Sequence, residues 1–273
     1  MHTMDYQAFD REIWDAELSD FVPGVIYDMH THMWSEQHKG GLKTPPGGLR
    51  LEIDYQDHLD WAKKLYPERK MHYLVLGTPI AGGMDIEQHN IWMAEEIKTD
   101  PESAVHMLVT PDMTPDYVAE QVKLHHFIGL KPYRIFAANM TYCRIHEFLP
   151  ESFIEVADDL GLAITMHLSK PNGPADPDNQ KDLAYFTKQY PRAQWILAHC
   201  ARAFNAFMME EAIHFLKDLP NIWYDTSAVN DLYSHYLLMK FEDRARVMFG
   251  SDNIVAGCAR GKYITYGRAW TYY

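Results

Sequence analysis

Residues 25–34, VIYDMHTHMW, decide the fold of this chain. The stretch begins as an apolar, β-prone run and ends in two histidines, His30 and His32, which are two positions apart. In an extended strand, residues i and i+2 point to the same face, so both imidazoles can reach one ion. Because the chain has 15 histidines in 273 residues, roughly one such pair is expected by chance, and the pair alone predicts little.

Three further strand ends carry side chains of the same kind. His167 closes the run ITMHLS, His199 closes WILAHCAR, and Asp252 closes VMFGSDN. Each of these runs is short, apolar and β-prone. Four metal-ligating side chains or pairs at the ends of apolar runs are much less expected by chance than one. Together they predict that four strand ends converge on a single metal ion.

Apolar strands alternate with amphipathic helices along the chain. Eight strands are expected, over residues 25–30, 71–78, 104–110, 127–133, 162–168, 194–199, 221–226 and 246–252. Helices are expected over residues 85–98, 114–125, 147–161, 176–190 and 204–219. Eight repeats of this kind predict an α/β fold, a parallel (β/α)8 or TIM barrel. An open doubly wound sheet is the alternative, but it would hold the first and eighth strands far apart.

The spacing of the candidate ligands agrees with a barrel. If one strand-helix unit takes about 30 residues, His32, His167, His199 and Asp252 follow one another at four units, one unit and two units. They then lie on strands one, five, six and eight. Each side chain is at the carboxyl end of its strand, which is where barrel enzymes build their active sites.

The composition narrows the functional class. A length of 273 residues suits one barrel domain over residues 1–273, and 47% hydrophobic content suits a packed globular body. A net charge of −13 disfavours nucleic acid and anionic membranes as partners. No apolar stretch is long enough to span a membrane, and the amino terminus lacks the pattern of a secretory signal. We therefore expect a cytoplasmic protein with a small-molecule substrate, and a homo-oligomer is compatible with the sequence.

The three cysteines do not suggest a structural framework. Cys143, Cys200 and Cys258 are widely spaced, which argues against disulfides and against a zinc-thiolate cluster. We expect them in the core or near the site.

Two segments depart from the repeating pattern. Residues 35–54, SEQHKGGLKTPPGGLRLEID, are rich in Gly and Pro and follow the first strand, so a lid or substrate loop is expected there. The 21 residues after Asp252 contain no convincing eighth helix. Either the barrel closes differently at this end or the chain is cut short.

The motifs at the strand ends resemble those of a known family. DMHTH (28–32), MH (166–167), AHC (198–200) and GSD (250–252) follow in this order, each at the end of an expected strand. The chain thereby resembles the amidohydrolase superfamily, specifically its amidohydrolase-2 branch, which includes the aminocarboxymuconate semialdehyde decarboxylase-like enzymes. The resemblance covers nearly the whole chain and implies a metal-dependent TIM-barrel enzyme.

The resemblance also implies a role for each matching residue. It assigns His30, His32, His167 and Asp252 to one divalent metal ion, usually zinc, and His199 to acid-base catalysis. Imidazole and carboxylate suit Zn²⁺, and a bound ion lowers the pKa of water to about 7. Asp252 is also expected to orient or deprotonate that water. Buried structural histidines, a helix cap at Asp252 and a ligand role for His199 are the alternatives.

Four further residues are candidates for substrate binding. Trp34 follows His32 closely, and Lys131 ends the fourth expected strand. In other branches of the superfamily a carboxylated lysine at that strand bridges two metals, but here a substrate-facing or snorkelling lysine is favoured. Arg134 and Arg202 are placed to grip a carboxylate, although an ordinary ion pair is as well supported. The remaining histidines, among them His38 and His89, are expected to be structural.

Three functions follow from these observations. The leading hypothesis is a metal-dependent hydrolase, in which metal-activated water attacks a carbonyl-type centre. The second is non-oxidative decarboxylation of a small carboxylated acid, aromatic or not. It is supported by the resemblance to the decarboxylase-like enzymes and by Arg134 and Arg202 as candidate carboxylate-binding residues. The third is a non-catalytic barrel with structural histidines.

Overall fold

Eight parallel strands form one sheet in which each strand pairs with its neighbours in chain order. The computed structural model describes residues 6–38, 52–78, 83–253, 263–266 and 269–272. The strands are β1 (Val25–Met33), β2 (Lys70–Gly77), β3 (Ala104–Val109), β4 (Gly129–Pro132), β5 (Ala163–Met166), β6 (Gln194–Leu197), β7 (Ile222–Asp225) and β8 (Val247–Met248). All eight expected strands are present, so the predicted barrel fold is confirmed.

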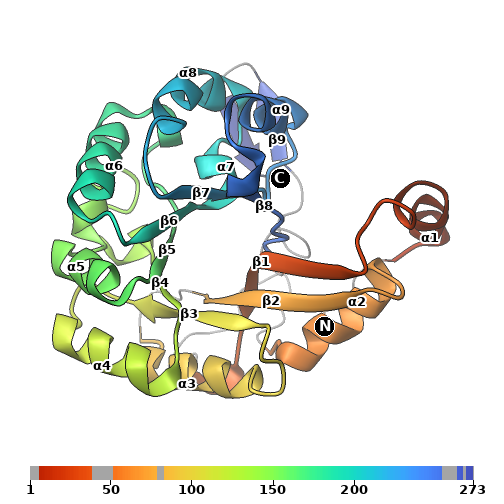
Figure 1. The fold of residues 1–273 in the computed structure, drawn as a ribbon, viewed down its shortest axis with the longest axis horizontal. Coiled ribbons are helices and arrows are strands. Elements are labelled where there is room, and N and C mark those ends of the chain that lie inside the picture. The colour runs from red at the N-terminus through yellow and green to blue at the C-terminus, as the bar shows by residue number, and fades with distance from the viewer. Residues whose placement is uncertain (1–5, 39–51, 79–82, 254–262, 267–268, 273) are drawn as a thin grey trace.

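Helices cover the outside of the strands, as Figure 1 shows for α3 to α6 and α8. The helices are α1 (Ala8–Ile13), α2 (Tyr55–Leu65), α3 (Ile86–Glu96), α4 (Pro115–His125), α5 (Glu151–Leu160), α6 (Pro177–Gln189), α7 (Ala198–Arg202), α8 (Ala206–Leu216) and α9 (Leu232–Phe241). The segments labelled η are a short π-helix, η1 (Trp14–Leu18), and the 3-10 helices η2 (Glu36–His38), η3 (Arg134–Phe136), η4 (Ile145–Glu147), η5 (Gly173–Ala175) and η6 (Arg244–Arg246). The five helices expected from the sequence correspond to α3, α4, α5, α6 and α8.

Side-chain caps set the starts of several helices. Asp85 begins α3 by accepting a hydrogen bond from the backbone of Gln88, and Thr114 does the same for α4. A cap of this kind satisfies a backbone N–H that has no partner within the helix. The helix starts are therefore encoded locally, which explains why they were readable from the sequence.

The ring of strands closes through a few backbone hydrogen bonds. The amide of Met29 donates to the carbonyl of Phe249 at 2.9 Å, and the amide of Asp252 donates to the carbonyl of His30 at 2.8 Å. His32 donates in the same way to Asn253 at 2.7 Å. β8 itself is only two residues long, so the seam lacks a regular ladder. These bonds nevertheless bring the end of the eighth strand against the two histidines of β1.

Apolar side chains fill the barrel on both faces of its strands. Leu74 and Leu76 of β2 contact Ile196 of β6 in one small cluster. Because these strands are far apart in the strand order, their side chains meet inside the barrel. A larger cluster lies between the strands and the outer helices. Burial on both faces explains the continuous apolar runs in the sequence.

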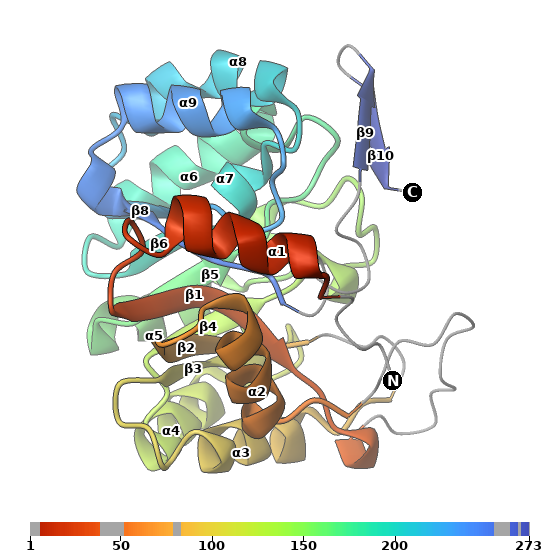
Figure 2. The same cartoon turned by 90° about the vertical axis from the view of Figure 1, so that its right-hand side faces the viewer.

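No helix follows β8 among the residues that the structure describes. Instead β9 (Tyr263–Tyr266) and β10 (Ala269–Tyr272) pair as a separate antiparallel sheet, away from the barrel strands in Figure 2. Part of the segment in which an eighth helix was not expected, residues 254–262, lies outside the described part of the chain. Most of the expected lid or substrate loop, residues 39–51, also lies outside it.

The helices of the described segments are all too short or too polar for a membrane crossing.

Gly129 on β4 tests the close packing of the barrel. A Cβ atom at this position would collide with the backbone oxygen of Ala163 and with the ring of His106. We expect Gly129→Ala to lower the free energy of unfolding by about 3 kcal/mol, at the upper end for overpacking. Urea denaturation measures the change. Gly24→Ala is the control, because a Cβ there meets no atom. Equal stability of the two variants would contradict this packing.

Candidate metal centre

The four predicted ligands and the predicted acid-base residue His199 come from four places at the carboxyl end of the barrel. His30 and His32 lie on β1, and His167 follows β5 directly. His199 lies in α7, just after β6, and Asp252 lies four residues beyond the end of β8. The sixth and eighth strands are thus shorter than the sequence suggested. All five side chains are nevertheless placed at the same end of the barrel.

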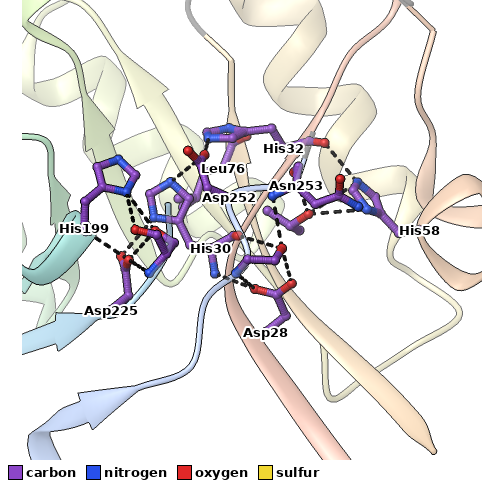
Figure 3. A network of polar contacts seen from close by, with 12 residues as sticks. Asp28, His30, His32, His58, Leu76, His199, Asp225, Asp252 and Asn253 are labelled. Atoms are coloured by element: carbon purple, nitrogen blue, oxygen red, sulfur yellow. Dashed lines mark hydrogen bonds and ion pairs between the residues drawn. The ribbon is translucent and has the colours of Figure 1, made fainter. Parts of the chain in front are cut away.

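His32 presents one ring nitrogen to the site because its other nitrogen is fixed. Nδ1 of His32 lies 2.9 Å from the carbonyl oxygen of Leu76, a group that only accepts hydrogen bonds. Nδ1 must therefore carry a proton, and Nε2 is the nitrogen that can ligate. That Nε2 lies 3.1 Å from Oδ1 of Asp252 (Figure 3).

His30 is held in the same manner by a carboxylate. Its Nδ1 lies 2.9 Å from Oδ2 of Asp225, at the end of β7. Its Nε2 lies 3.5 Å from Oδ1 of Asp252. Figure 3 shows His30 between the two carboxylates, with His32 beside Asp252. Three potential ligand atoms, one from each of these residues, lie within 4.8 Å of one another.

The electrostatics of the three groups call for a cation between them. Burial lowers the pKa of His30 to about 4, even though Asp225 opposes the shift, so its ring is neutral. Burial would raise the pKa of Asp252, but the hydrogen bond with His32 and the nearby rings lower it to about 2. The lone pair on Nε2 of the neutral His30 ring then faces the carboxylate of Asp252. A divalent cation satisfies such a donor set.

His167 and His199 lie next to this group. The His199 ring centroid is 4.8 Å from that of His30 and 5.1 Å from that of His167. Nδ1 of His167 lies 3.1 Å from the carbonyl oxygen of Leu168, so its Nε2 is again the available nitrogen. The structure brings His30, His32 and Asp252 together most tightly, with His199 beside His30 and His167 beyond His199.

His199 sits in a left-handed turn that no glycine provides. Four consecutive residues, His199 to Arg202, have φ angles of 60°, 49°, 59° and 64°. Left-handed backbone costs roughly 1–2 kcal/mol per non-glycine residue. The amide of His199 donates to Oδ1 of Asp225 at 3.1 Å, and the amide of Ala203 donates to the carbonyl of His199 at 3.1 Å. Such strain at a strand end is typical of functional sites.

Asp225 and Ser227 connect His199 to His30. Nδ1 of His199 lies 2.8 Å from Oγ of Ser227, and that hydroxyl donates a short hydrogen bond to Oδ1 of Asp225. Oδ2 of the same carboxylate receives the hydrogen bond from His30. Burial alone would raise the pKa of Asp225, but its electrostatic interaction and hydrogen bond with the His30 ring hold that pKa well below its usual range. One carboxylate therefore orients both imidazoles.

Asp28 anchors the loop that carries Asp252. Its carboxylate accepts hydrogen bonds from the amide and the hydroxyl of Ser251, at 2.9 and 2.5 Å. Burial raises the pKa of Asp28 to about 7 despite these bonds. The first Asp of the DMHTH motif and the Ser of GSD are thus partners across the barrel seam.

Sequence reasoning did not single out Asp28, Asp225 or Ser227. A usable signal existed for Asp225, since it ends the strand NIWYDT as Asp252 ends its own. No sequence signal indicated Ser227, because its role depends on the left-handed turn opposite to it.

Lys131 of β4 is fully buried near the candidate ligands. Its Nζ has no hydrogen-bond acceptor among the described residues and lies 4.8 Å from the ring centroid of Tyr133. Burial lowers the pKa of Lys131 to about 8, although Asp225 and Asp252 attract its charge. A buried ammonium without a hydrogen-bonded anion is costly, and a bound anion would offset that cost.

Arg134 and Arg202, which the sequence suggested for binding a carboxylate, donate hydrogen bonds to backbone carbonyl oxygens. The buried Arg202 donates from Nη1 to the carbonyl oxygens of Ser169 and Lys170 and so ties the loop after β5 to the His199 turn. Arg134 donates from Nη1 to the carbonyl of Met140 at 2.6 Å. Trp34 follows β1 and pairs through its backbone with Ile53.

Comparison with known proteins agrees with the barrel. The chain matches the model of a protein family described as amidohydrolase over residues 27–257. No curated protein sequence matches it at a significant level.

Several solved structures share its fold. The 5-carboxyvanillate decarboxylase of Sphingomonas paucimobilis has a TM-score of 0.62 at 14% identity, covering 85% of this chain and 89% of that chain. The 4-oxalomesaconate hydratase of Rhodopseudomonas palustris has a TM-score of 0.57 at 18% identity, with coverages of 85% and 82%. The 2,6-dihydroxybenzoate decarboxylase of Rhizobium has a TM-score of 0.52 at 15% identity, with coverages of 86% and 90%.

Asp225 provides the sharpest test of this geometry. Asp225→Asn keeps the shape of the side chain but removes the negative charge from the group that accepts the hydrogen bond of His30 Nδ1. We expect the affinity for Zn²⁺ to fall by about 10- to 100-fold, as is typical when the hydrogen-bond partner of a ligand is lost. Competition with a chromogenic chelator measures it. Asp159→Asn, exposed on α5, is the control. An unchanged affinity in Asp225→Asn would contradict the proposed orientation of His30.

Proposed function

This chain belongs to the amidohydrolase family, and we propose that it is a metal-dependent enzyme that hydrolyses a small, carboxylate-bearing substrate. The observation that carries this proposal is the meeting of three ligand atoms, from His30, His32 and Asp252, within 4.8 Å at the carboxyl end of the barrel. Zinc is the proposed ion, since neutral imidazole and carboxylate are ligands that it favours.

The residues that fit one divalent ion are His30, His32 and Asp252. His167, which lies beside His199 and is not in that group, is proposed as a further ligand on the family resemblance alone. Nδ1 of each of the three histidines faces a carboxylate or a carbonyl, which leaves Nε2 for the metal. When bound, the ion supplies Lewis acidity and lowers the pKa of water to about 7.

The chain's own side chains then handle the proton. Oδ1 of Asp252 lies beside both β1 histidines and would face the ion, so the second oxygen of this carboxylate would be the one to accept a proton from water. His199 keeps a proton on Nδ1 through Ser227, so its Nε2 is the nitrogen that accepts and returns a proton. Burial lowers the pKa of His199, which favours the neutral ring, the form that can act as a base.

Lys131 indicates the class of substrate. Its buried ammonium has no hydrogen-bond acceptor among the described residues, and a carboxylate of the substrate would supply one. The buried ammonium of Lys131 supports an anionic substrate in spite of the chain's net negative charge. A nearby cation attracts the substrate more strongly than distant, screened negative charges repel it.

Decarboxylation is a second candidate. Two of the similar structures are decarboxylases that act, by name, on 5-carboxyvanillate and 2,6-dihydroxybenzoate. Lys131, whose Nζ has no hydrogen-bond acceptor in the described part of the chain, also suits a substrate that carries a carboxylate. A panel of small carboxylic acids, with their esters and amides, separates the two reactions. Carbon dioxide release from the free acids identifies decarboxylation, and product formation without it identifies hydrolysis.

Metal removal tests the metal-dependent part of the proposal. The double variant His30→Ala, His32→Ala should bind less than a tenth of the metal of the wild type, because both fixed Nε2 atoms are lost. Dialysis against a chelator should abolish wild-type activity on any substrate found, and Zn²⁺ should restore it. Elemental analysis gives the metal content. A double variant that retains metal and full activity would overturn the assignment.

Lys131→Met tests the substrate class. We expect this variant to bind benzoate, as a probe carboxylate, about 10- to 100-fold more weakly, because a charge-assisted hydrogen bond contributes about 1.5–3 kcal/mol. Calorimetry on the zinc-loaded proteins measures the affinity. Lys123→Met, exposed on α4, removes the same charge elsewhere. Equal weakening in both variants would show a general charge effect instead.

A further inference from the structure

Four side chains beside the metal centre bury polar atoms that have no hydrogen-bond partner among the described residues. The atoms are Nε1 of Trp34, Nδ1 of His38, Oγ1 of Thr78 and both ring nitrogens of His89. We call these four residues the polar corner. Trp34 follows the end of β1, and Thr78 follows the end of β2. Since Met33 pairs with Gly77, these two residues come next to each other in the parallel register.

The two histidines of the polar corner are also neighbours. Their ring centroids are 5.7 Å apart. The amide of Asp85, which caps α3, donates to the carbonyl of His38 at 3.0 Å. α3 is itself fixed to β3, because the Asn90 side chain exchanges hydrogen bonds of 2.9 and 2.8 Å with the backbone of Leu108. His89 is therefore presented by a rigid helix and not by a loop.

Unpartnered polar atoms in such a place need an explanation. A buried donor or acceptor without a partner costs its full desolvation, so folded proteins contain few of them. His89 is completely buried, and neither of its ring nitrogens has a hydrogen-bond partner in the described part of the chain. These groups are explained if a ligand supplies the missing hydrogen bonds.

The polar corner favours an uncharged ligand group. Trp34 offers an N–H donor, Thr78 a hydroxyl, and His89 one donor and one acceptor. Burial and the neighbouring rings lower the pKa of His89 to about 3, so it brings no charge. The carboxylates of Asp85 and Glu52 act on His38 and disfavour an anion. Among the described residues, the groups of three ligand atoms suited to a metal ion all include His30, and none includes His38 or His89.

The polar corner adjoins the metal centre. Trp34 and Thr78 come two positions after His32 and Leu76 in the chain, and Nδ1 of His32 lies 2.9 Å from the carbonyl oxygen of Leu76. Lys131 lies on β4, further round the barrel. We propose that the polar corner binds a hydroxyl or carbonyl group of the substrate whose carboxylate lies at Lys131. This inference rests on the proposed function for the carboxylate end only.

Binding of simple acids tests the inference. The probes are benzoate and the three monohydroxybenzoates, titrated into zinc-loaded protein by calorimetry. We expect at least one hydroxybenzoate to bind about tenfold more tightly than benzoate, the gain of one good hydrogen bond. His89→Leu and Thr78→Val should remove this advantage and leave benzoate affinity unchanged.

The urea midpoint of unfolding is a second measurement, and it separates a ligand-binding histidine from a histidine that only stabilises the fold. Because His89 has no hydrogen bonds to lose, His89→Leu should leave the urea midpoint unchanged or raise it. His72→Leu is the matched control: His72 is equally buried, but its Nδ1 is bonded to Asp100 at 2.8 Å. This control should lower the midpoint.

The outcomes separate the two proposals. If benzoate binds and no hydroxyl group improves its affinity, the polar corner is not a subsite, while the carboxylate end stands. If no acid binds, both are overturned. If His89→Leu lowers the midpoint as much as His72→Leu does, His89 is structural and the inference fails.

Discussion

The candidate site depends on the hydrogen bonds that hold Nδ1 of its histidines. A carbonyl fixes His32, a carboxylate fixes His30, and Ser227 fixes His199. In each ring the proton is thereby placed on Nδ1, and Nε2 is left as the free lone pair. Two of these lone pairs meet the carboxylate of Asp252. The arrangement is stable only with a cation or a proton between them, and burial disfavours the proton on His30.

Much of this could be predicted from the sequence because it is written in local patterns. The apolar strand runs, the capped helices and the histidines at strand ends each follow short-range rules, and their order in the chain implies the barrel. The family resemblance rested on the same strand ends, and the match over residues 27–257 confirms it.

The rest could not be predicted because it arises from contacts between distant segments. The turn from His199 to Arg202 is left-handed but contains no glycine, the residue that would indicate such a backbone in a sequence. It is stabilised by Asp225, which comes from the next strand. The hydrogen bonds from Arg202 to backbone carbonyl oxygens likewise depend on the contact between the loop after β5 and the His199 turn.

The site concentrates features that cost stability. A left-handed turn, a buried ammonium at Lys131 and the unpartnered atoms of the polar corner are each unfavourable in the protein alone. Features of this kind persist where a ligand offsets them. These features lie at the carboxyl end of one barrel, and on our proposal they would hold the metal ion, the carboxylate and the polar group of one substrate.

X-ray absorption spectroscopy of the zinc-loaded protein tests the central claim most directly. The account predicts a first shell of nitrogen and oxygen atoms near 2.0–2.1 Å, with imidazole scattering that decreases in the His30→Ala, His32→Ala variant. A shell that contains sulfur, or imidazole scattering unchanged in that variant, would contradict it.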